Sequence, residues 1–152
     1  MGSNTIWPMK KSLTPIIFWA LIGVFLFILS QFFIPAVSDL FRGSKLFLIP
    51  LAVFSLLGLA LLVLTLKEKT TGKLKKFLVL TGASSTGFFV FVFLHNAFYA
   101  LGIVTSHITV LNYLMEALHV AFFFIAIFIC PLGFLVGTAG SIVMFIKKKG
   151  VV

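Results

Sequence analysis

Side chains that could carry out chemistry are rare in this sequence, and most of them lie between residues 95 and 119. Glu116 and His119 are three residues apart, a spacing that places a carboxylate and an imidazole on the same face of a helix. His95, in the preceding apolar run, adds a second imidazole. Two histidines and one carboxylate suit Zn²⁺, Fe²⁺ or Cu²⁺. The sequence therefore raises the hypothesis of a metal site made of His95, Glu116 and His119, and it indicates no other cofactor.

Further polar residues accompany these three candidates. Asn96 and Tyr99 follow His95, and His107 precedes Glu116. His95 and Tyr99 share a helix face because they are four residues apart. These residues would either surround the metal or form a hydrogen-bonded polar cap between two helices. The Glu-x-x-His spacing is common by chance, so the sequence favours the cap.

The composition decides the class of protein. Of the 152 residues, 61% are hydrophobic and only 10% are charged, with a mean hydropathy of +1.24. A soluble domain carries about 25% charged residues, so the exterior of this chain must face lipid. The 12 Lys and Arg residues against 3 Asp and Glu lie mostly at the ends of apolar runs, where they contact anionic headgroups. We expect the lipid bilayer and these headgroups as partners, and no nucleic acid.

Four uncharged runs are long enough to cross a bilayer, which needs about 20 apolar residues. We expect an all-α integral membrane protein with a single membrane domain, residues 1–152, folded as an antiparallel bundle of four transmembrane helices. The predicted spans are 15–37, 46–66, 77–100 and 121–146. Pro131 should kink the fourth helix.

Two segments leave alternatives open. The residues around 108–119 have helical spacing of their Leu and Met side chains, and form either an interfacial helix or a direct extension of the last span. The first run, followed by Ala36-Val37-Ser38, also resembles a signal peptide with a small-residue cleavage site. A signal peptide has a core of only about 7–15 apolar residues, and this longer run favours a retained span.

The basic residues predict the orientation. The N-terminal head, the 67–76 loop and the C-terminal tail carry ten Lys and Arg residues, whereas segments 38–45 and 105–120 carry two. Cytoplasmic loops are enriched in these residues. We therefore expect both termini in the cytoplasm, in the cytoplasmic membrane of a prokaryote.

Small residues recur on two of the spans. They are Gly82, Ala83 and Gly87 in the third, and Gly133, Gly137 and Ser141 in the fourth. Helices in lipid associate through close backbone approach, which small residues permit. We interpret these faces as helix packing within one chain, with a homo-oligomer interface as the alternative.

The remaining pattern excludes several functions. All three acidic residues lie in loops or at interfaces, whereas proton-coupled carriers need a carboxylate inside the membrane. Cys130 is the only cysteine, which excludes an intrachain disulfide. The sequence predicts a non-enzymatic subunit or scaffold of a membrane complex or homo-oligomer. The alternatives are an extracytoplasmic metal- or small-ligand-binding protein that uses His95, Glu116 and His119, and a permease for a neutral or lipid-like solute along the hydroxyl face at 84–86.

Overall fold

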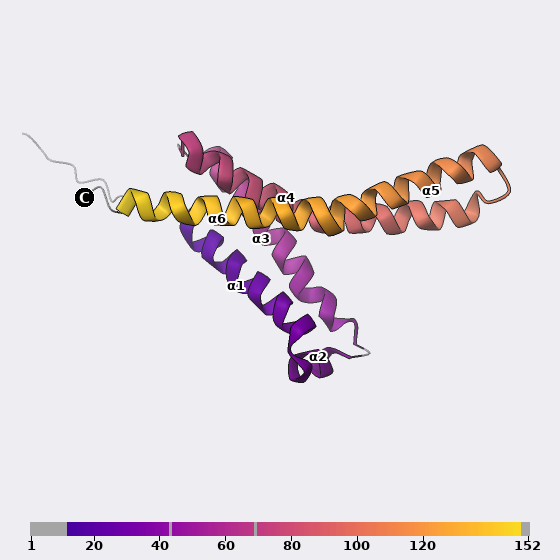
Figure 1. Cartoon of the computed structure of the whole chain (residues 1–152), viewed down its shortest axis with the longest axis horizontal. Coiled ribbons are helices and arrows are strands. Elements are labelled where there is room, and N and C mark those ends of the chain that lie inside the picture. Colours follow the sequence, from indigo (N-terminus) through magenta and orange to yellow (C-terminus); the bar gives the residue numbers. More distant parts are fainter. Residues whose placement is uncertain (1–11, 43, 69, 150–152) are drawn as a thin grey trace, which may run out of the picture.

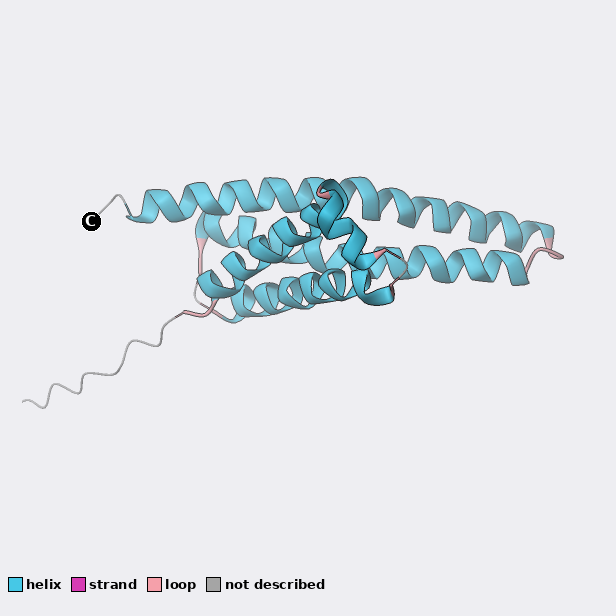
Figure 2. Cartoon of the chain, turned by 90° about the horizontal axis from the view of Figure 1, so that it is seen from below, coloured by secondary structure: helices cyan, strands magenta, loops and turns pink. Residues whose placement is uncertain are grey.

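The computed structural model describes residues 12–42, 44–68 and 70–149, and within these ranges it is helical without any strand (Figure 2). Four helices are long and apolar enough to cross a membrane: Thr14–Phe33, Lys45–Lys67, Gly72–Val104 and Thr109–Lys147. The sequence-based prediction of an all-α membrane protein with four spans is therefore confirmed. The basic residues Lys10, Lys11 and Lys69 lie outside the described residues.

The first span ends earlier than predicted. α1 (Thr14–Phe33) stops before Ile34, which is extended with φ −108° and ψ 109°. Proline disfavours the helical conformation in the residue before it, and Pro35 follows directly. Pro35 then begins the short helix α2 (Pro35–Phe41), which turns back so that the rings of Phe27 and Phe41 lie 6.2 Å apart. The predicted span 15–37 is thus divided at Ile34 into a spanning helix and an elbow.

The second and third spans meet through a short link. A turn of 3₁₀ helix, η1 (Lys45–Phe47), leads into α3 (Leu48–Lys67), and a link of four residues separates α3 from α4 (Gly72–Val104). Gly72 has φ +69°, a conformation that only glycine adopts without strain. α4 starts five residues before the predicted 77, so Lys73, Lys75 and Lys76 extend from its first turns.

The fourth span is longer than predicted. α5 (Thr109–Phe124), a π-helical turn η2 (Ile125–Ile129) and α6 (Cys130–Lys149) follow one another without a break. Figure 1 shows α5 lying alongside the second half of α4. Of the two alternatives for segment 108–119, the structure therefore has the direct extension of the last span.

The irregularity predicted at Pro131 lies one turn earlier, in η2. A proline ring collides with the carbonyl group four residues before it, and for Pro131 that residue is Ile127, inside the π-helical turn. A π-helical turn widens the backbone locally. We attribute η2 to the accommodation of Pro131 within a continuous helix.

Three of the four helix–helix contacts around the bundle bring the backbones close together. The fourth, between α1 and α6, is made by aromatic rings. α3 packs on α1 and α4, and α4 packs on α6. Between α1 and α6, the ring centroids of Phe18 and Phe145 lie 5.4 Å apart, and those of Phe25 and Phe134 lie 4.7 Å apart. Phe18 and Leu21 are fully buried, so α1 is part of the core.

Beyond the bundle, α4 and α5 continue as a pair. We call residues 86–124 the outer hairpin. No residue in this range is buried, whereas the preceding part of α4 buries Leu78, Thr81, Gly82 and Ser85. The outer hairpin projects past the ends of α1 and α3 in both views (Figure 1 and Figure 2). Apart from its first residues, which contact α3 and α6, the outer hairpin is formed by the packing of α4 on α5.

Candidate functional site on the outer hairpin

His95 and His119 form the centre of the polar cluster on the outer hairpin. The Nδ1 atom of His95 lies 2.9 Å from the backbone carbonyl oxygen of His119. Because a carbonyl oxygen only accepts hydrogen bonds, Nδ1 must carry the proton, which leaves Nε2 of neutral His95 as an acceptor. The two imidazole rings are 5.3 Å apart, and the ring of Tyr99 lies 5.5 Å from that of His119. These contacts join α4 to α5.

His119 and Tyr99 also line a pocket of about 190 Å³. It contains one carboxylate, one phenol, one imidazole, one amide and one hydroxyl group. Its lining residues are Tyr99, Gly102, Ile103, Ser106, Asn112, Glu116 and His119. The pocket therefore offers hydrogen-bond donors, acceptors and one negative charge to a small polar molecule.

The proposed metal ligands are divided between these two features. Glu116 and His119 both line the pocket, but His95 does not. Within the described ranges, no three His, Cys, Asp or Glu side chains come close enough together to hold one metal ion. The three-ligand set suggested by the sequence is thus not found among the described residues.

The two accompanying residues Asn96 and His107 have other surroundings. The Nδ2 atom of Asn96 donates to the carbonyl oxygen of Val92, 2.8 Å away in its own helix, and the side chain is exposed. His107 is exposed in the connection between α4 and α5. Of the predicted second layer of residues, only Tyr99 lies beside the histidine pair.

Most of the small residues lie where helices meet. A Cβ atom added to Gly82 would lie 2.8 Å from the carbonyl oxygen of Gly58 in α3. On α6, Gly133 faces the Ser84 hydroxyl, and a Cβ atom on Gly137 would lie 2.6 Å from Oγ1 of Thr81. Three further residues complete the set: Gly87 lies next to Cys130, Ser141 is fully buried and Ala83 is exposed. The glycines therefore serve contacts between α4 and its two neighbours.

The hydroxyl groups at 84–86, predicted as a possible path for a solute, lie at the same contacts between α4 and its neighbours. Ser85 donates to the carbonyl oxygen of Thr81 at 2.7 Å, and Thr86 donates to that of Gly82 at 2.8 Å. The Oγ atom of Ser55 in α3 lies 3.3 Å from the carbonyl oxygen of Thr86. These groups satisfy the backbone and leave little to line a polar path.

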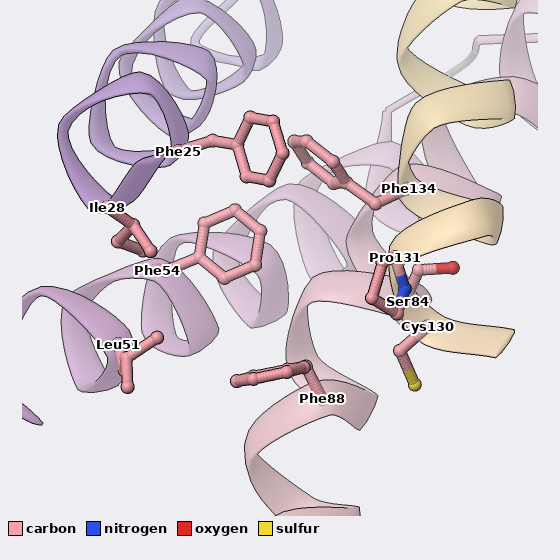
Figure 3. A pocket seen from close by; sticks show the side chains of 9 residues that line it. All are labelled: Phe25, Ile28, Leu51, Phe54, Ser84, Phe88, Cys130, Pro131 and Phe134. Carbon is pink, nitrogen blue, oxygen red and sulfur yellow. The ribbon is translucent and has the colours of Figure 1, made fainter. Parts of the chain in front are cut away.

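A small cavity lies at the centre of the bundle, between α1, α3, α4 and α6 (Figure 3). Its volume is about 90 Å³, and its lining is almost entirely apolar: Phe25, Ile28, Leu51, Phe54, Ser84, Phe88, Cys130, Pro131 and Phe134. The hydroxyl group of Ser84 is turned toward Gly133. The sequence does not reveal this cavity, because Phe residues occur throughout the spans and nothing distinguishes the ones that line it.

Comparison of the chain with protein-family models, with curated protein sequences and with solved structures finds no match. The fold itself supplies the class. The chain is an all-α polytopic membrane protein, built as a four-span bundle from which the outer hairpin projects.

Proposed function

We propose that the protein is a non-enzymatic membrane scaffold that associates with a second copy of itself through the outer hairpin. One observation carries this proposal: none of the 16 residues of α5 is buried, and neither is any residue of α4 beyond Ser85. A span of a stable bundle normally packs on two neighbours. α5 has only α4.

The exposed surface of the hairpin suits another membrane helix. Val104, Val110 and Tyr113 are 70%, 81% and 68% exposed. Ala117 and Ala121 are also exposed and lie four residues apart, on one face of α5. Small residues at this spacing allow two helices in lipid to approach closely.

A two-fold pair is the simplest arrangement that would cover this face. Two helical hairpins placed face to face form a four-helix bundle. Two-fold dimers are also the commonest closed oligomers, since one surface then serves both partners. The small-residue faces of α4 and α6 are occupied within the chain, so the face of α5 with Ala117 and Ala121 is the surface we assign to self-association.

The orientation belongs to the same proposal. Thr14, Glu68, Lys73 and Phe145 line one groove, so the start of α1, the α3–α4 link and α6 meet at one end of the bundle. The positive-inside rule puts this end in the cytoplasm, where Lys73, Lys75, Lys76 and Lys147 would contact anionic headgroups. The tip of the outer hairpin, the turn at 105–108, would then lie on the extracytoplasmic side.

The test is the stoichiometry of the protein in bilayers. Stepwise photobleaching of a fluorescent fusion in nanodiscs or supported bilayers should count two copies for the native chain. Ala117→Trp or Ala121→Trp should shift the count to one, because the large ring blocks close approach. Ala139→Trp, at an exposed position of α6, should leave two copies. A monomeric native chain would refute the interface. Ala117→Trp and Ala121→Trp variants that remain dimeric would also refute it.

The pocket beside Glu116 supports a second candidate function, the binding of a small polar ligand. The observation is the convergence of Glu116, Tyr99 and Asn112 around about 190 Å³. A carboxylate next to an aromatic ring favours an organic cation. A panel of small amines should raise the thermal midpoint of the native chain, and Glu116→Gln should abolish that rise.

A further inference from the structure

Gln31, near the end of α1, holds a buried amide with no partner. The residue is only 9% exposed, and its Nε2 atom makes no hydrogen bond to any described residue. A buried polar group without a partner is destabilising. A group outside the described residues should therefore satisfy the amide.

Gln31 borders a pocket made by the elbow of the chain. We call it the elbow pocket, and its volume is about 200 Å³. α2 folds back over the end of α1, and η1 closes the remaining side. The lining residues are Gln31, Phe32, Ser38, Phe41, Arg42 and Phe47. The only glutamine and the only arginine of the sequence thus meet in one pocket.

The polar lining consists mainly of hydrogen-bond donors. Gln31, Ser38 and Arg42, which carry an amide, a hydroxyl group and a guanidinium, all border the elbow pocket. Asp39 binds one edge of the guanidinium, with 2.8 Å between Nη2 and Oδ1. Arginine has five N–H donors in a fork, so the ion pair leaves others for an oxyanion.

The rest of the lining is aromatic and open toward lipid. Phe32 is 68% exposed and Phe47 is 43% exposed, and both border the same pocket as the donors. An occupant must therefore combine an oxygen-rich group with hydrocarbon. Asp39 already neutralises Arg42, which disfavours a small free anion and favours an amphiphile that also gains from the aromatic rings.

The depth of the pocket fits one such amphiphile. Gln31 lies two residues before the end of the spanning helix, and Arg42 follows the elbow. The end of a spanning helix is expected near the phosphate and glycerol groups of a bilayer. The elbow is also at the opposite end of the bundle from Glu68 and Lys73, because α1 and α3 each run the full span between them.

We propose that the elbow pocket binds the phosphate–glycerol region of a phospholipid. The Gln31 amide, the Ser38 hydroxyl and the free edge of Arg42 donate to phosphate and ester oxygens. The acyl chains run along Phe32 and Phe47. The lipid comes from the leaflet opposite the lysine-rich end, so this site is distinct from the headgroup contacts of Lys73, Lys75 and Lys76.

The experiment uses full-length protein that has been stripped of lipid in a mild detergent. Native mass spectrometry counts the phospholipid retained after phosphatidylglycerol or phosphatidylethanolamine is added, and the thermal midpoint is followed over the same titration. The native chain should retain one phospholipid with a rise in midpoint. Gln31→Leu and Arg42→Gln should each weaken retention about tenfold, which corresponds to the loss of one good hydrogen bond.

Gln31→Leu also carries its own folding control. It removes the unpartnered amide while keeping a similar volume, so its midpoint without lipid should equal or exceed that of the native chain. Asn96→Leu is the matched control variant, since it removes an exposed amide that bonds within its own helix. It should retain phospholipid as the native chain does.

Three outcomes would overturn the proposal. If Gln31→Leu retains phospholipid with native affinity, water rather than lipid satisfies the amide. If diacylglycerol raises the midpoint as much as phospholipid does, the pocket does not recognise phosphate. If inorganic phosphate alone reproduces the rise, the site takes a free anion and not a lipid.

Discussion

The hydroxyl group of Thr14, at the start of α1, donates a hydrogen bond to Oε2 of Glu68, 2.8 Å away at the end of α3. The same oxygen accepts the hydroxyl group of Ser12 at 2.7 Å. α1 has no side-chain cap of its own. Glu68 therefore acts as the cap of a helix from a different span, and its negative charge suits the positive end of that helix.

This capping contact predicts how stability depends on pH. Hydrogen bonds from the Ser12 and Thr14 hydroxyl groups hold the pKa of Glu68 below its ordinary value of 4.5. A carboxyl group whose pKa is lowered by folding stabilises the fold above its unfolded pKa, and loses that contribution as pH falls through the folded value. The native chain should lose thermal stability below pH 4.5.

Glu68→Gln should flatten this part of the profile, measured by circular dichroism in detergent micelles. Glu116→Gln is the control, because that carboxylate is exposed and accepts no hydrogen bond from the described residues. Thr14→Val should lower stability by about 1 kcal/mol near neutral pH, the usual contribution of one hydrogen bond. Equal acid profiles for the native chain and Glu68→Gln would remove Glu68 from this role.

The glycines provide a second, paired prediction. A Cβ atom on Gly137 would meet Oγ1 and the backbone nitrogen of Thr81 at 2.6 and 2.7 Å, so Gly137→Ala must push α4 and α6 apart. We expect a loss of about 1–3 kcal/mol, typical of overpacking. A Cβ atom on Gly23 meets nothing within 4 Å. Gly23→Ala should therefore be neutral or should stabilise α1 by up to about 1 kcal/mol.

Denaturation of both variants in mixed micelles measures the difference. If Gly137→Ala were as stable as Gly23→Ala, the close approach of α4 and α6 at this position would be wrong. The comparison is clean because both changes add one methyl group to a helix interior and differ only in what that group meets.

The membrane class and the number of spans could be predicted from the sequence, because both follow from the length of uncharged runs and the depth of a bilayer. The ends of the spans could not. Pro35 divides the first run although its neighbours are apolar, and α5 joins α6 although Glu116 and His119 interrupt its hydropathy. The length of an uncharged run reflects the free-energy cost of placing polar residues in lipid. It does not show which helix packs beside the run.

The candidate sites show the same limit. His95 and His119 could be paired from helical spacing and polarity, and the structure brings them into contact. The sequence pattern does not mark Gln31, because it is a single uncharged residue in an apolar run, and its proximity to Arg42 depends on the elbow of the chain. Such a contact depends on the backbone direction after Pro35, which composition and spacing do not give.

Because aromatic rings connect α1 to α6, we expect the stability of the bundle to depend strongly on Phe134. This ring is 3% exposed and lies 4.7 Å from the ring of Phe25 and 5.0 Å from that of Phe54. Phe134→Ala should cost about 3 kcal/mol, since it enlarges the central cavity and removes contacts that lipid cannot easily replace. Phe128→Ala, at a 52% exposed position, should cost much less. Similar losses for the two variants would show that the rings do not close the bundle.

Metal content tests the polar cluster of the outer hairpin. His95 uses Nδ1 for the carbonyl oxygen of His119, and Glu116 lies in a pocket that His95 does not border. With no three-ligand group among the described residues, we expect protein purified without chelator to carry no stoichiometric Zn, Fe or Cu in elemental analysis. Addition of a chelator should leave the thermal midpoint unchanged.

His95→Leu separates the two interpretations of the cluster. If the histidine pair is a structural cap, this variant loses about 1 kcal/mol of stability with the hydrogen bond to His119, and its metal content equals that of the native chain. If the pair holds a metal, the native chain carries the ion at near-stoichiometric level and the variant loses it. That second result would require a rearrangement bringing Glu116 to His95, and it would return the metal hypothesis to first place.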